Sequence, residues 1–434
     1  MAAPDERAGG EGWQAVVIGA GQAGLAAAHE LARRGLRPSE DFAVLDASPG
    51  PGGAWRERWD SLTLGRAHRV ADLPGLPLGS PDPRAPASRV VSDYYDRYER
   101  VFDLRVQRPV RVRAVRASGL AAPALRLGRP SLRSRAPGQT GESGVPRDTW
   151  LAVEAEAAGR PRTLLARMVI SATGTWTHPY VPWVPGAPGF RGRQMHTAGY
   201  RRAEDLAGAR VVVVGGGLSA VQFLLELAPV AASTTWATRR PPNFTRAAFD
   251  EQWGAEVERA VDRRTASGTP PASVVRTTGI PLLPEYLRGV REGVLVSRGM
   301  FDRVGLEGVR FSPDALTGEQ ARGGLGPSAR DGSGGAGELV VPESWRPFEE
   351  PTWVEADVLF WNTGFRHALT HLAPLRLREP GGGIQMSSRV AVARDPRVLM
   401  VGYGSSASTL GATRAGREAG RVAVERLGPA ARRR

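Results

Sequence analysis

The residues most suited to chemistry are three glycines near the start of the chain, in the run GAGQAG at positions 19–24. Their spacing is G-x-G-x-x-G, and each glycine has its own physical task. Gly19 permits a tight turn, Gly21 lets a phosphate group approach the backbone, and Gly24 lets the following helix pack closely on the preceding strand. Free N–H groups and the positive dipole end at the start of that helix attract negative charge. The loop therefore predicts a binding site for the pyrophosphate of a dinucleotide.

An acidic residue follows this loop where a ribose would need it. Asp46 lies 22 residues past Gly24 and directly follows the apolar run FAVL at 42–45. A carboxylate at the end of the second strand accepts hydrogen bonds from ribose hydroxyls, whereas it repels a 2′-phosphate. The first site therefore suits an unphosphorylated ribose, as in FAD or NAD.

A second glycine-rich turn lies in the middle of the chain. Gly215, Gly217 and Ala220 form G-x-G-x-x-A, and the strand that follows ends in Arg239 and Arg240 instead of an acid. A guanidinium group pairs with phosphate in a bidentate way, so arginine at this point favours a ribose with a 2′-phosphate. This loop therefore predicts an NADPH site, and either arginine could bind the 2′-phosphate. That both are ordinary surface arginines remains open.

The elements around the two loops predict an α/β fold with two Rossmann-like dinucleotide-binding domains. Residues 14–48 read as strand, glycine turn, helix and strand, and residues 209–240 repeat that plan. A flavin and a nicotinamide in one chain imply hydride transfer from NADPH to FAD. We expect a disordered N-terminus at 1–12, a discontinuous FAD-binding domain at 13–185 and 345–425, an inserted NADPH-binding domain at 186–344 with a helical insertion at about 245–300, and a tail at 426–434.

Composition excludes several classes of protein. The 434 residues favour two domains, and there is no Cys, which excludes disulfide relays and thiolate metal sites. No metal site is expected. All 58 cationic residues are Arg, which excludes a Schiff-base lysine. We interpret the net charge of +14 as composition bias and expect no nucleic-acid partner. We find no membrane-spanning run and no signal peptide, so we expect a cytoplasmic location.

Four segments together resemble one enzyme family. The stretches PGGAWRERWDSLTL (51–64), ISATGTW (170–176) and DVLFWNTGFRHAL (357–369) resemble segments of the flavin-containing monooxygenases, in the same order. Phe190, Gly192, His196 and Tyr200 resemble the fingerprint F-x-G-x-x-x-H-x-x-x-Y/F of that family, which belongs to the class B flavoprotein monooxygenases. Related Baeyer–Villiger enzymes usually have Trp at the last position. The segment 401–416 also resembles bacterial flavoproteins linked by name to cation transport, a role to which we give little weight.

The resemblance implies further site residues. It implies additional flavin contacts at Gly53, Trp55, Thr173 and Gly174. His196 and Tyr200 are catalytic candidates on the connector between the domains, where we favour an organising role for His196 over proton transfer. Relatives carry Asn or Lys near the flavin after the WDSL region. Here Arg66 and His68 are the nearest polar substitutes, and both are also catalytic candidates.

The function that this resemblance implies is an NADPH-dependent FAD monooxygenase. It would form a flavin C4a-hydroperoxide from dioxygen and oxygenate a small organic substrate, with Tyr200 favouring attack on N or S over ketone insertion. Three alternatives remain open: Baeyer–Villiger oxygenation of a ketone, an NADPH oxidase or reductase without oxygen insertion, and a flavin- and NADP-binding sensor with little turnover. The expected partners are dioxygen and a small molecule, and a homodimer is open.

Overall fold

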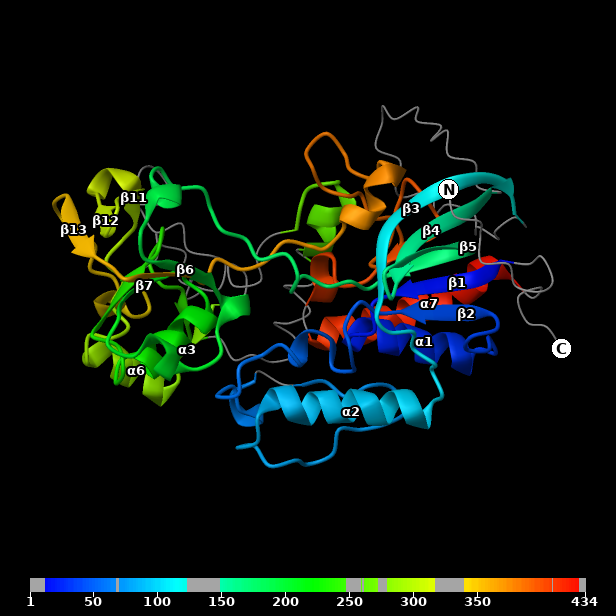
Figure 1. Cartoon of the computed structure of the whole chain (residues 1–434), viewed down its shortest axis with the longest axis horizontal. Coiled ribbons are helices and arrows are strands. Elements are labelled where there is room, and N and C mark those ends of the chain that lie inside the picture. The colour runs from blue at the N-terminus through cyan, green and yellow to red at the C-terminus, as the bar shows by residue number, and fades with distance from the viewer. Residues whose placement is uncertain are drawn as a thin grey trace.

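The protein has two lobes joined by extended connections, as Figure 1 shows. The computed structural model describes residues 12–67, 70–122, 149–246, 259, 261–271, 279–316, 339–407 and 409–428. Each lobe is built around parallel strands, so the predicted α/β class with two Rossmann-like units is confirmed. Within these residues, no helix has both the length and the apolar character that a membrane crossing requires.

The first lobe contains a six-stranded sheet. Its order is β2 (Phe42–Leu45), β1 (Trp13–Ile18), β5 (Arg160–Ser171), β4 (Thr149–Ala157) and β3 (Val110–Ala121), and β15 (Val398–Met400) pairs with the last residues of β5. The pairs among β1, β2, β5 and β15 are parallel, whereas β3 and β4 are antiparallel to their neighbours. The parallel part is the Rossmann-like unit, and the antiparallel strands extend it.

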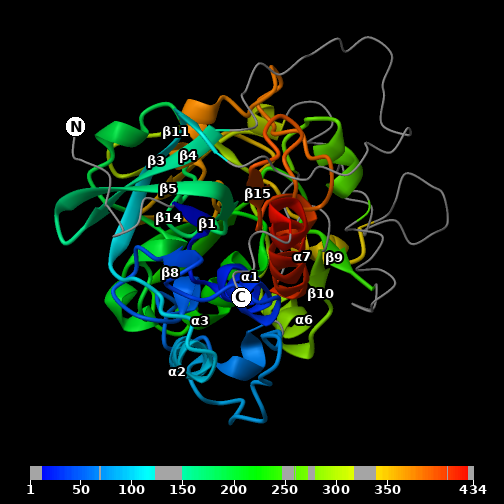
Figure 2. The same cartoon turned by 90° about the vertical axis from the view of Figure 1, so that its right-hand side faces the viewer.

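Helices cover one face of this sheet. Helix α1 (Gln22–Arg33) and helix α7 (Thr409–Leu427) lie side by side, and Figure 2 shows both. Ala415, Ala419 and Ala423 of α7 are fully buried, and these small side chains let the two helices approach closely. Helix α2 (Ala87–Val101) adds three tyrosines to the same core. The glycine loop before α1 is therefore set on a rigid two-helix layer.

The second lobe has a four-stranded parallel sheet. Its order is β6 (Arg193–His196), β14 (Val358–Trp361), β7 (Arg210–Val214) and β8 (Ser233–Ala237). Helices α3 (Leu218–Leu227) and α6 (Pro284–Arg291) pack on one face, and an antiparallel sheet packs on the other, formed by β11 (Phe301–Val304), β12 (Gly308–Phe311) and β13 (Thr352–Glu355). A short parallel pair joins β9 (Phe244–Thr245) to β10 (Ile280–Pro281).

The strand pairing differs from the domain boundaries that we expect from the sequence. Strands β13 and β14 belong to the second lobe, although both lie within the segment 345–425 assigned to the first domain. The apolar run VLFW forms strand β14 between β6 and β7. Its place in the second lobe depends on pairing with strands that are distant in the sequence, so local sequence patterns do not indicate it. We therefore propose that the chain returns to the first lobe near residue 362. Helix α7 also extends to Leu427, so the tail begins after that residue.

Other expected segments are covered only in part. Residues 261–266 and α6 are helical within the insertion expected at 245–300, and β9 and β10 are short strands there. The rest of that insertion, residues 247–258 and 272–278, lies largely outside the described residues, as do residues 1–11 of the expected N-terminal segment.

Two crossings of the chain between the lobes pair with each other. The first leaves the end of β5 and the second leaves the end of β14. Tyr180 N donates to Gly364 O at 3.0 Å, and Arg366 N donates to His178 O at 2.8 Å. Because each crossing starts at the carboxyl end of a parallel strand, the carboxyl ends of both sheets face the junction. Ligands of open α/β sheets bind at that end of the strands.

Candidate cofactor and active site

The first glycine loop has the geometry of a pyrophosphate cradle. Gly19 has φ +99°, and a Cβ there would lie 2.5 Å from Ala172 O. A Cβ at Gly24 would lie 1.8 Å from Gly19 O, so neither position accepts a side chain. Gly21 differs, because a Cβ added there would meet no atom within 4 Å. The open space beside Gly21, at the N-terminus of α1, fits the phosphates of FAD.

Asp46 is held at the edge of this loop. Its Oδ2 accepts from Ala20 N at 2.6 Å, and its Oδ1 accepts from Ser48 N at 2.7 Å. Arg108 Nε lies 3.7 Å from Oδ1, while the two terminal nitrogens of Arg108 bind Glu99 at 2.6 and 2.7 Å. A carboxylate oxygen keeps further lone pairs for ribose hydroxyls after these bonds. Sequence reasoning missed Arg108 and Glu99, because no local pattern links them to Asp46.

The other expected flavin contacts lie around this loop and the crossings. A Cβ at Gly53 would lie 2.9 Å from Gly21 Cα, so the segment 51–55 closes directly on the first turn. Trp55 packs against the cores of both lobes. Thr173 Oγ1 donates to Ala368 O at 2.8 Å, and Gly174, with φ +63°, accepts from Ala368 N at 3.0 Å. These residues hold the start of the first crossing against the second.

A buried histidine strengthens the same contact between the end of β5 and the second crossing. His371 Nε2 lies 3.0 Å from Ser171 Oγ, and both side chains are buried. Burial lowers the pKa of His371 to about 4. The imidazole is therefore neutral in the folded protein at neutral pH, which gives it a structural role.

Stability is expected to fall as the pH is lowered from about 6.5 to about 4. The unfolded chain protonates His371 near its ordinary pKa of 6.5, whereas the folded state resists protonation down to about 4. The unfolded state therefore binds more protons in this window, so the free energy of unfolding rises with pH by up to about 3 kcal/mol. Urea unfolding at several pH values measures this slope. His371→Gln should reduce it and Ser171→Ala should retain it; equal slopes in His371→Gln and wild type would contradict the assignment.

The second glycine loop repeats the steric arrangement of the first. Gly215 has φ +135°, and a Cβ there would lie 2.2 Å from Asn362 O, at the end of the central strand β14. Trp236 Nε1 donates to Gly215 O at 2.7 Å. Gly217 is the residue before α3, and Ala220 in its first turn is fully buried. The loop thus directs the N-terminus of α3 toward the junction.

The two arginines after β8 have different surroundings. Thr238 Oγ1 donates to Arg240 O at 2.6 Å and lies 2.7 Å from Ser297 Oγ, which fixes this turn. Arg240 is partly buried and makes a contact of its own within the protein. Arg239 is exposed and forms neither a hydrogen bond nor an ion pair with the described residues. Arg239 is therefore the guanidinium that is free to bind a phosphate.

His196 of the fingerprint joins β6 to the second crossing. Its Nε2 lies 3.0 Å from Gly364 O and its Nδ1 accepts from Ala198 N at 3.3 Å. Its ring meets the edge of Phe365 at 4.9 Å. Burial lowers the pKa of His196, which favours the neutral ring with its proton on Nε2. Because both ring nitrogens have protein partners, the geometry supports an organising role for this residue.

Tyr200 lies in the core of the second lobe rather than beside a cofactor loop. Its ring stacks on Phe360 at 5.5 Å, and its hydroxyl donates to Glu226 Oε1 at 2.8 Å. Ser61 Oγ, from the segment after Trp59 in the first lobe, donates to the same oxygen at 2.7 Å. Glu226 is thus a shared acceptor between the lobes. These contacts support a positioning role for Tyr200, and sequence reasoning did not identify Glu226.

Tyr200→Phe is expected to destabilise the second lobe beside its contact with the first. The change removes one hydrogen bond to a charged acceptor and leaves the ring in place, so the free energy of unfolding should fall by about 1.5–3 kcal/mol. Urea unfolding measures the loss. A double-mutant cycle with Ser61→Ala should give a non-zero coupling energy, because both hydroxyls share Glu226 Oε1. Strict additivity of the two substitutions would show that the shared acceptor is unimportant.

The structure describes one of the two remaining catalytic candidates. Arg66 ends the short 3₁₀ helix Leu64–Arg66, is exposed, and lies beside α3, where its main-chain oxygen accepts from Gln222 Nε2 at 3.5 Å. His68 lies outside the described residues. Neither residue gains support for a catalytic role from the described geometry.

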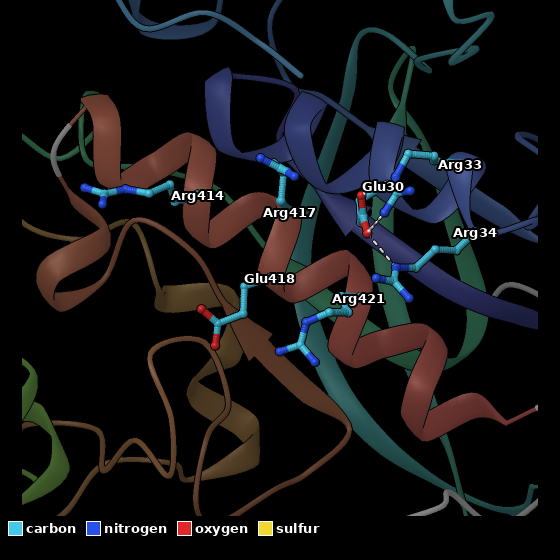
Figure 3. Close-up of a pocket in the computed structure, with 7 residues that line it drawn as sticks. All are labelled: Glu30, Arg33, Arg34, Arg414, Arg417, Glu418 and Arg421. Atoms are coloured by element: carbon cyan, nitrogen blue, oxygen red, sulfur yellow. Dashed lines mark hydrogen bonds and ion pairs between the residues drawn. The ribbon is translucent and has the colours of Figure 1, made fainter. Parts of the chain in front are cut away.

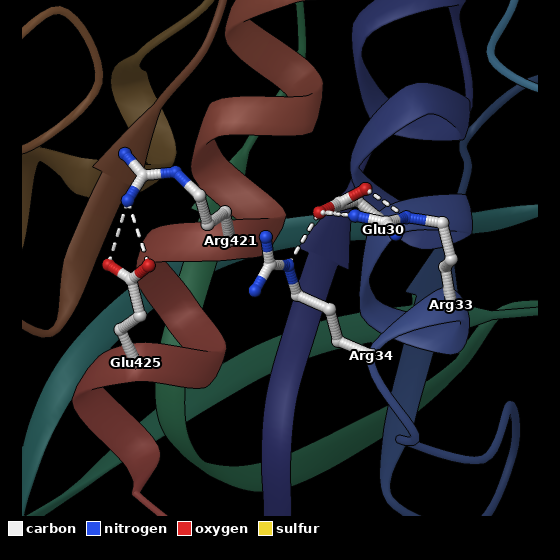
Figure 4. Close-up of polar contacts among 5 residues, drawn as sticks. All are labelled: Glu30, Arg33, Arg34, Arg421 and Glu425. Atoms are coloured by element: carbon white, nitrogen blue, oxygen red, sulfur yellow. Dashed lines mark hydrogen bonds and ion pairs between the residues drawn. The ribbon is translucent and has the colours of Figure 1, made fainter.

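A charged groove between α1 and α7 is separate from this site. It has a volume of about 300 Å³ and is lined by Glu30, Arg33, Arg34, Arg414, Arg417, Glu418 and Arg421 (Figure 3). Glu30 binds Arg33 and Arg34 at 2.8 and 2.5 Å, and Arg421 binds Glu425 at 2.8 Å (Figure 4). The groove includes the C-terminal end of α1, whereas the first glycine loop lies at its N-terminal end. Glu30 is buried, whereas the side chains of Arg421 and Glu425 are about half exposed, so only the latter pair belongs to a solvated surface.

Known protein families match both halves of the site. Residues 17–75 match the NAD(P)-binding Rossmann-like domain, and residues 153–258 match the family described as pyridine nucleotide-disulphide oxidoreductase. The printed sequence has no Cys, so the chain shares the dinucleotide-binding architecture of the second family without a redox disulfide.

Individual relatives extend the likeness. The flavin-containing monooxygenase from Stenotrophomonas maltophilia is 30% identical, with a TM-score of 0.64, over 94% of this chain and 97% of that chain. The indole-3-pyruvate monooxygenase YUCCA1 of Oryza sativa is 31% identical over 52% of this chain and 47% of its own length. The Baeyer-Villiger monooxygenase of Streptomyces coelicolor is 33% identical over 52% of this chain and 37% of its own length. The chain thus spans about half or less of these two curated relatives.

The fold and the paired glycine loops define a flavin-dependent oxidoreductase with two dinucleotide-binding units. The likeness to the Stenotrophomonas enzyme covers nearly the whole of both chains. The protein therefore belongs to the class B flavin monooxygenase family, as the four sequence segments predict.

Proposed function

We propose that the protein is an NADPH-dependent FAD monooxygenase that uses dioxygen to oxygenate a small organic substrate at N or S. The observation that carries the proposal is the contrast between two glycine loops whose strands end at one junction. The first loop is followed by the buried carboxylate of Asp46, and the second by the free guanidinium of Arg239. This contrast supports two different dinucleotides, one without and one with a 2′-phosphate.

The first lobe would hold the flavin. Gly21 and the N-terminus of α1 would bind the pyrophosphate, and Asp46 would accept hydrogen bonds from ribose hydroxyls. Gly53 and Gly174 would close over the rest of the cofactor from the two segments that meet near the junction. Bound FAD supplies the electron transfer and the activation of dioxygen, since no side chain of this chain has such chemistry.

The second lobe would hold NADPH. Gly217 and the N-terminus of α3 would bind its pyrophosphate, and Arg239 would pair with the 2′-phosphate. Because the carboxyl ends of both sheets face the junction, the nicotinamide would be delivered toward the flavin. The protein contributes orientation in this step, which can account for a large part of a rate enhancement.

Aromatic side chains at the junction would exclude water from the reacting groups. Trp176 on the first crossing stacks on Phe365 of the second at 4.8 Å, and Trp59 packs on Phe223 of α3 at 4.6 Å. An apolar, water-poor junction favours oxygen transfer to the substrate over release of hydrogen peroxide. Oxygenation of a ketone is the second candidate. The Streptomyces relative favours it, whereas Tyr200, where Baeyer–Villiger enzymes usually have Trp, favours N or S.

Flavin reduction and product analysis test the proposal. NADPH should bleach the flavin of the anaerobic protein. In ¹⁸O₂, a correct substrate should stimulate NADPH consumption, lower the peroxide released per NADPH, and yield a product that carries one labelled oxygen atom. The screen should contain amines, thioethers, indole-type acids and ketones. Stoichiometric peroxide with every compound would identify an oxidase, and failure of NADPH to bleach the flavin would favour a sensor.

A further inference from the structure

An arginine at the junction lies among tryptophans. The guanidinium carbon of Arg58 lies 4.0 Å from the ring centre of Trp176 and 5.8 Å from those of Trp55 and Trp59. These rings attract the cation, but such an attraction leaves the N–H donors of the guanidinium unused. The arrangement fixes the orientation of the side chain without satisfying its hydrogen bonds.

The part of the chain that the structure describes offers this charge no acidic partner. Among the described residues, none forms an ion pair or a hydrogen bond with the Arg58 guanidinium, and its Nε is buried without any partner. Burial lowers the pKa of Arg58 to about 10, so the side chain remains protonated at neutral pH. The side chain is partly buried, and proteins normally pair such a cation, because an uncompensated charge is costly away from water. An unpaired arginine in this place therefore needs an explanation.

The position of Arg58 supplies one. Its segment starts at Gly53, which touches the first glycine turn, and continues to Trp59, which packs on Phe223 of α3. The ring that covers the guanidinium, Trp176, belongs to the first crossing and stacks on Phe365 of the second. The charge thus lies where the two crossings and both lobes meet. A ligand that spans the junction would pass this point.

We propose that Arg58 binds an oxyanion of a ligand at the junction, either a phosphate of the nicotinamide dinucleotide or the carboxylate of the organic substrate. Both groups accept hydrogen bonds from the guanidinium fork and supply the missing negative charge. The stack on Trp176 holds the fork ready, so little side-chain freedom is lost on binding. The proposal rests on the proposed function only for the identity of the dinucleotide.

Binding to the oxidised, FAD-loaded protein tests this inference without turnover. The variants are Arg58→Gln, which removes the charge, and Arg58→Lys, which keeps the charge but not the fork. The matched control is Arg97→Gln, because Arg97 also lies over an aromatic ring, Tyr94 at 5.8 Å, but is exposed on α2. Tryptophan fluorescence titrations with NADP⁺ and with phenylacetate give the dissociation constants. Urea unfolding without ligand gives the stability.

Arg58→Gln is expected to bind one of the two probes at least about tenfold more weakly, with ligand-free stability equal to or above that of the wild type. Loss of NADP⁺ affinity identifies the dinucleotide phosphate, and loss of phenylacetate affinity identifies a carboxylate. Arg58→Lys should lose several-fold affinity for the same probe, which keeps the test valid if Arg58→Gln does not fold. The control should bind like the wild type. Unchanged affinity of the Arg58 variants for both probes overturns the inference. Anaerobic reduction of the wild type by NADPH tests the proposed function separately.

Discussion

Gly21→Val is expected to fold and to purify without flavin. A Cβ at this position meets no protein atom within 4 Å, and the backbone there is extended, with φ −78° and ψ −172°, which valine adopts readily. The polypeptide alone therefore tolerates the side chain. The isopropyl group would fill the space in which we propose that the pyrophosphate approaches the N-terminus of α1.

The expected loss is large because charge-assisted hydrogen bonds would be lost together. Each is worth about 1.5–3 kcal/mol, so displacement of the phosphates from two backbone N–H groups should weaken FAD binding by about a hundredfold or more. The flavin absorbance of the purified protein, and titration of the apoprotein with FAD, measure this change. The apoproteins of the wild type and of Gly21→Val should have closely similar circular dichroism spectra and urea unfolding curves.

Gly24→Ala is the matched comparison. It should destabilise the protein itself, whereas Gly21→Val should lose flavin and keep its stability. A Cβ added at Gly24 would lie 1.8 Å from Gly19 O, so α1 must move away from β1 even when no cofactor is bound. We expect the apoprotein itself to be destabilised, by about 1–3 kcal/mol or more. A Gly21→Val protein that retained full flavin, or that unfolded as easily as Gly24→Ala, would contradict the cradle.

The parts of the fold that the sequence predicts are those with local signals. The periodicity of residues 14–48 and 209–240 predicts both Rossmann-like units, because a strand, a glycine turn and a helix follow one another directly. The α/β class and the family follow from those units and the four segments, and the comparisons confirm both. The strand pairing differs from the expected return to the first domain at 345, because β14 pairs with β6 and β7, which precede it by more than a hundred residues.

The candidate site likewise contains some residues that local sequence patterns identify and others that they do not. The glycines and Asp46 can be read from spacing, and their roles remain predictions that the geometry supports. Glu226 and Arg108 could not be assigned from the sequence, because their partners are distant in the chain and their residue types are common. The resemblance implies a flavin contact for Trp55, but no spacing in the sequence relates Trp55, Trp59 and Trp176 to Arg58. Only the tertiary structure brings them onto one guanidinium.

The two crossings explain why so many of these contacts lie in one place. His196, Thr173, Asn362 and Trp176 all bind or pack against the same pair of connections, although they come from different strands and turns. Packed connections of this kind hold the two cofactor loops at a fixed separation. The fingerprint residues His196 and Tyr200 therefore act, in this interpretation, on cofactor alignment instead of on bonds of the substrate.

Arg239→Gln is expected to change the nicotinamide preference of the enzyme, whereas Arg240→Gln is not. Arg239 is exposed and has no partner among the described residues, while Arg240 is partly buried and already engaged in the protein. Loss of a bidentate pair with the 2′-phosphate should raise the KM for NADPH by about 10–100-fold. NADH lacks that phosphate, so its KM should change little.

The comparison between the two cofactors is what makes this prediction specific. Rates of flavin reduction over a range of NADPH and NADH concentrations give kcat/KM for each cofactor. The ratio of the NADPH value to the NADH value should fall in Arg239→Gln and stay near that of the wild type in Arg240→Gln. A higher salt concentration should weaken NADPH binding in the wild type more than in Arg239→Gln, because the exposed charge pair is screened. If Arg240→Gln alone lost the preference, the phosphate would bind on the buried side of the turn that Thr238 fixes. If neither variant changed it, the second lobe would recognise its dinucleotide without the 2′-phosphate.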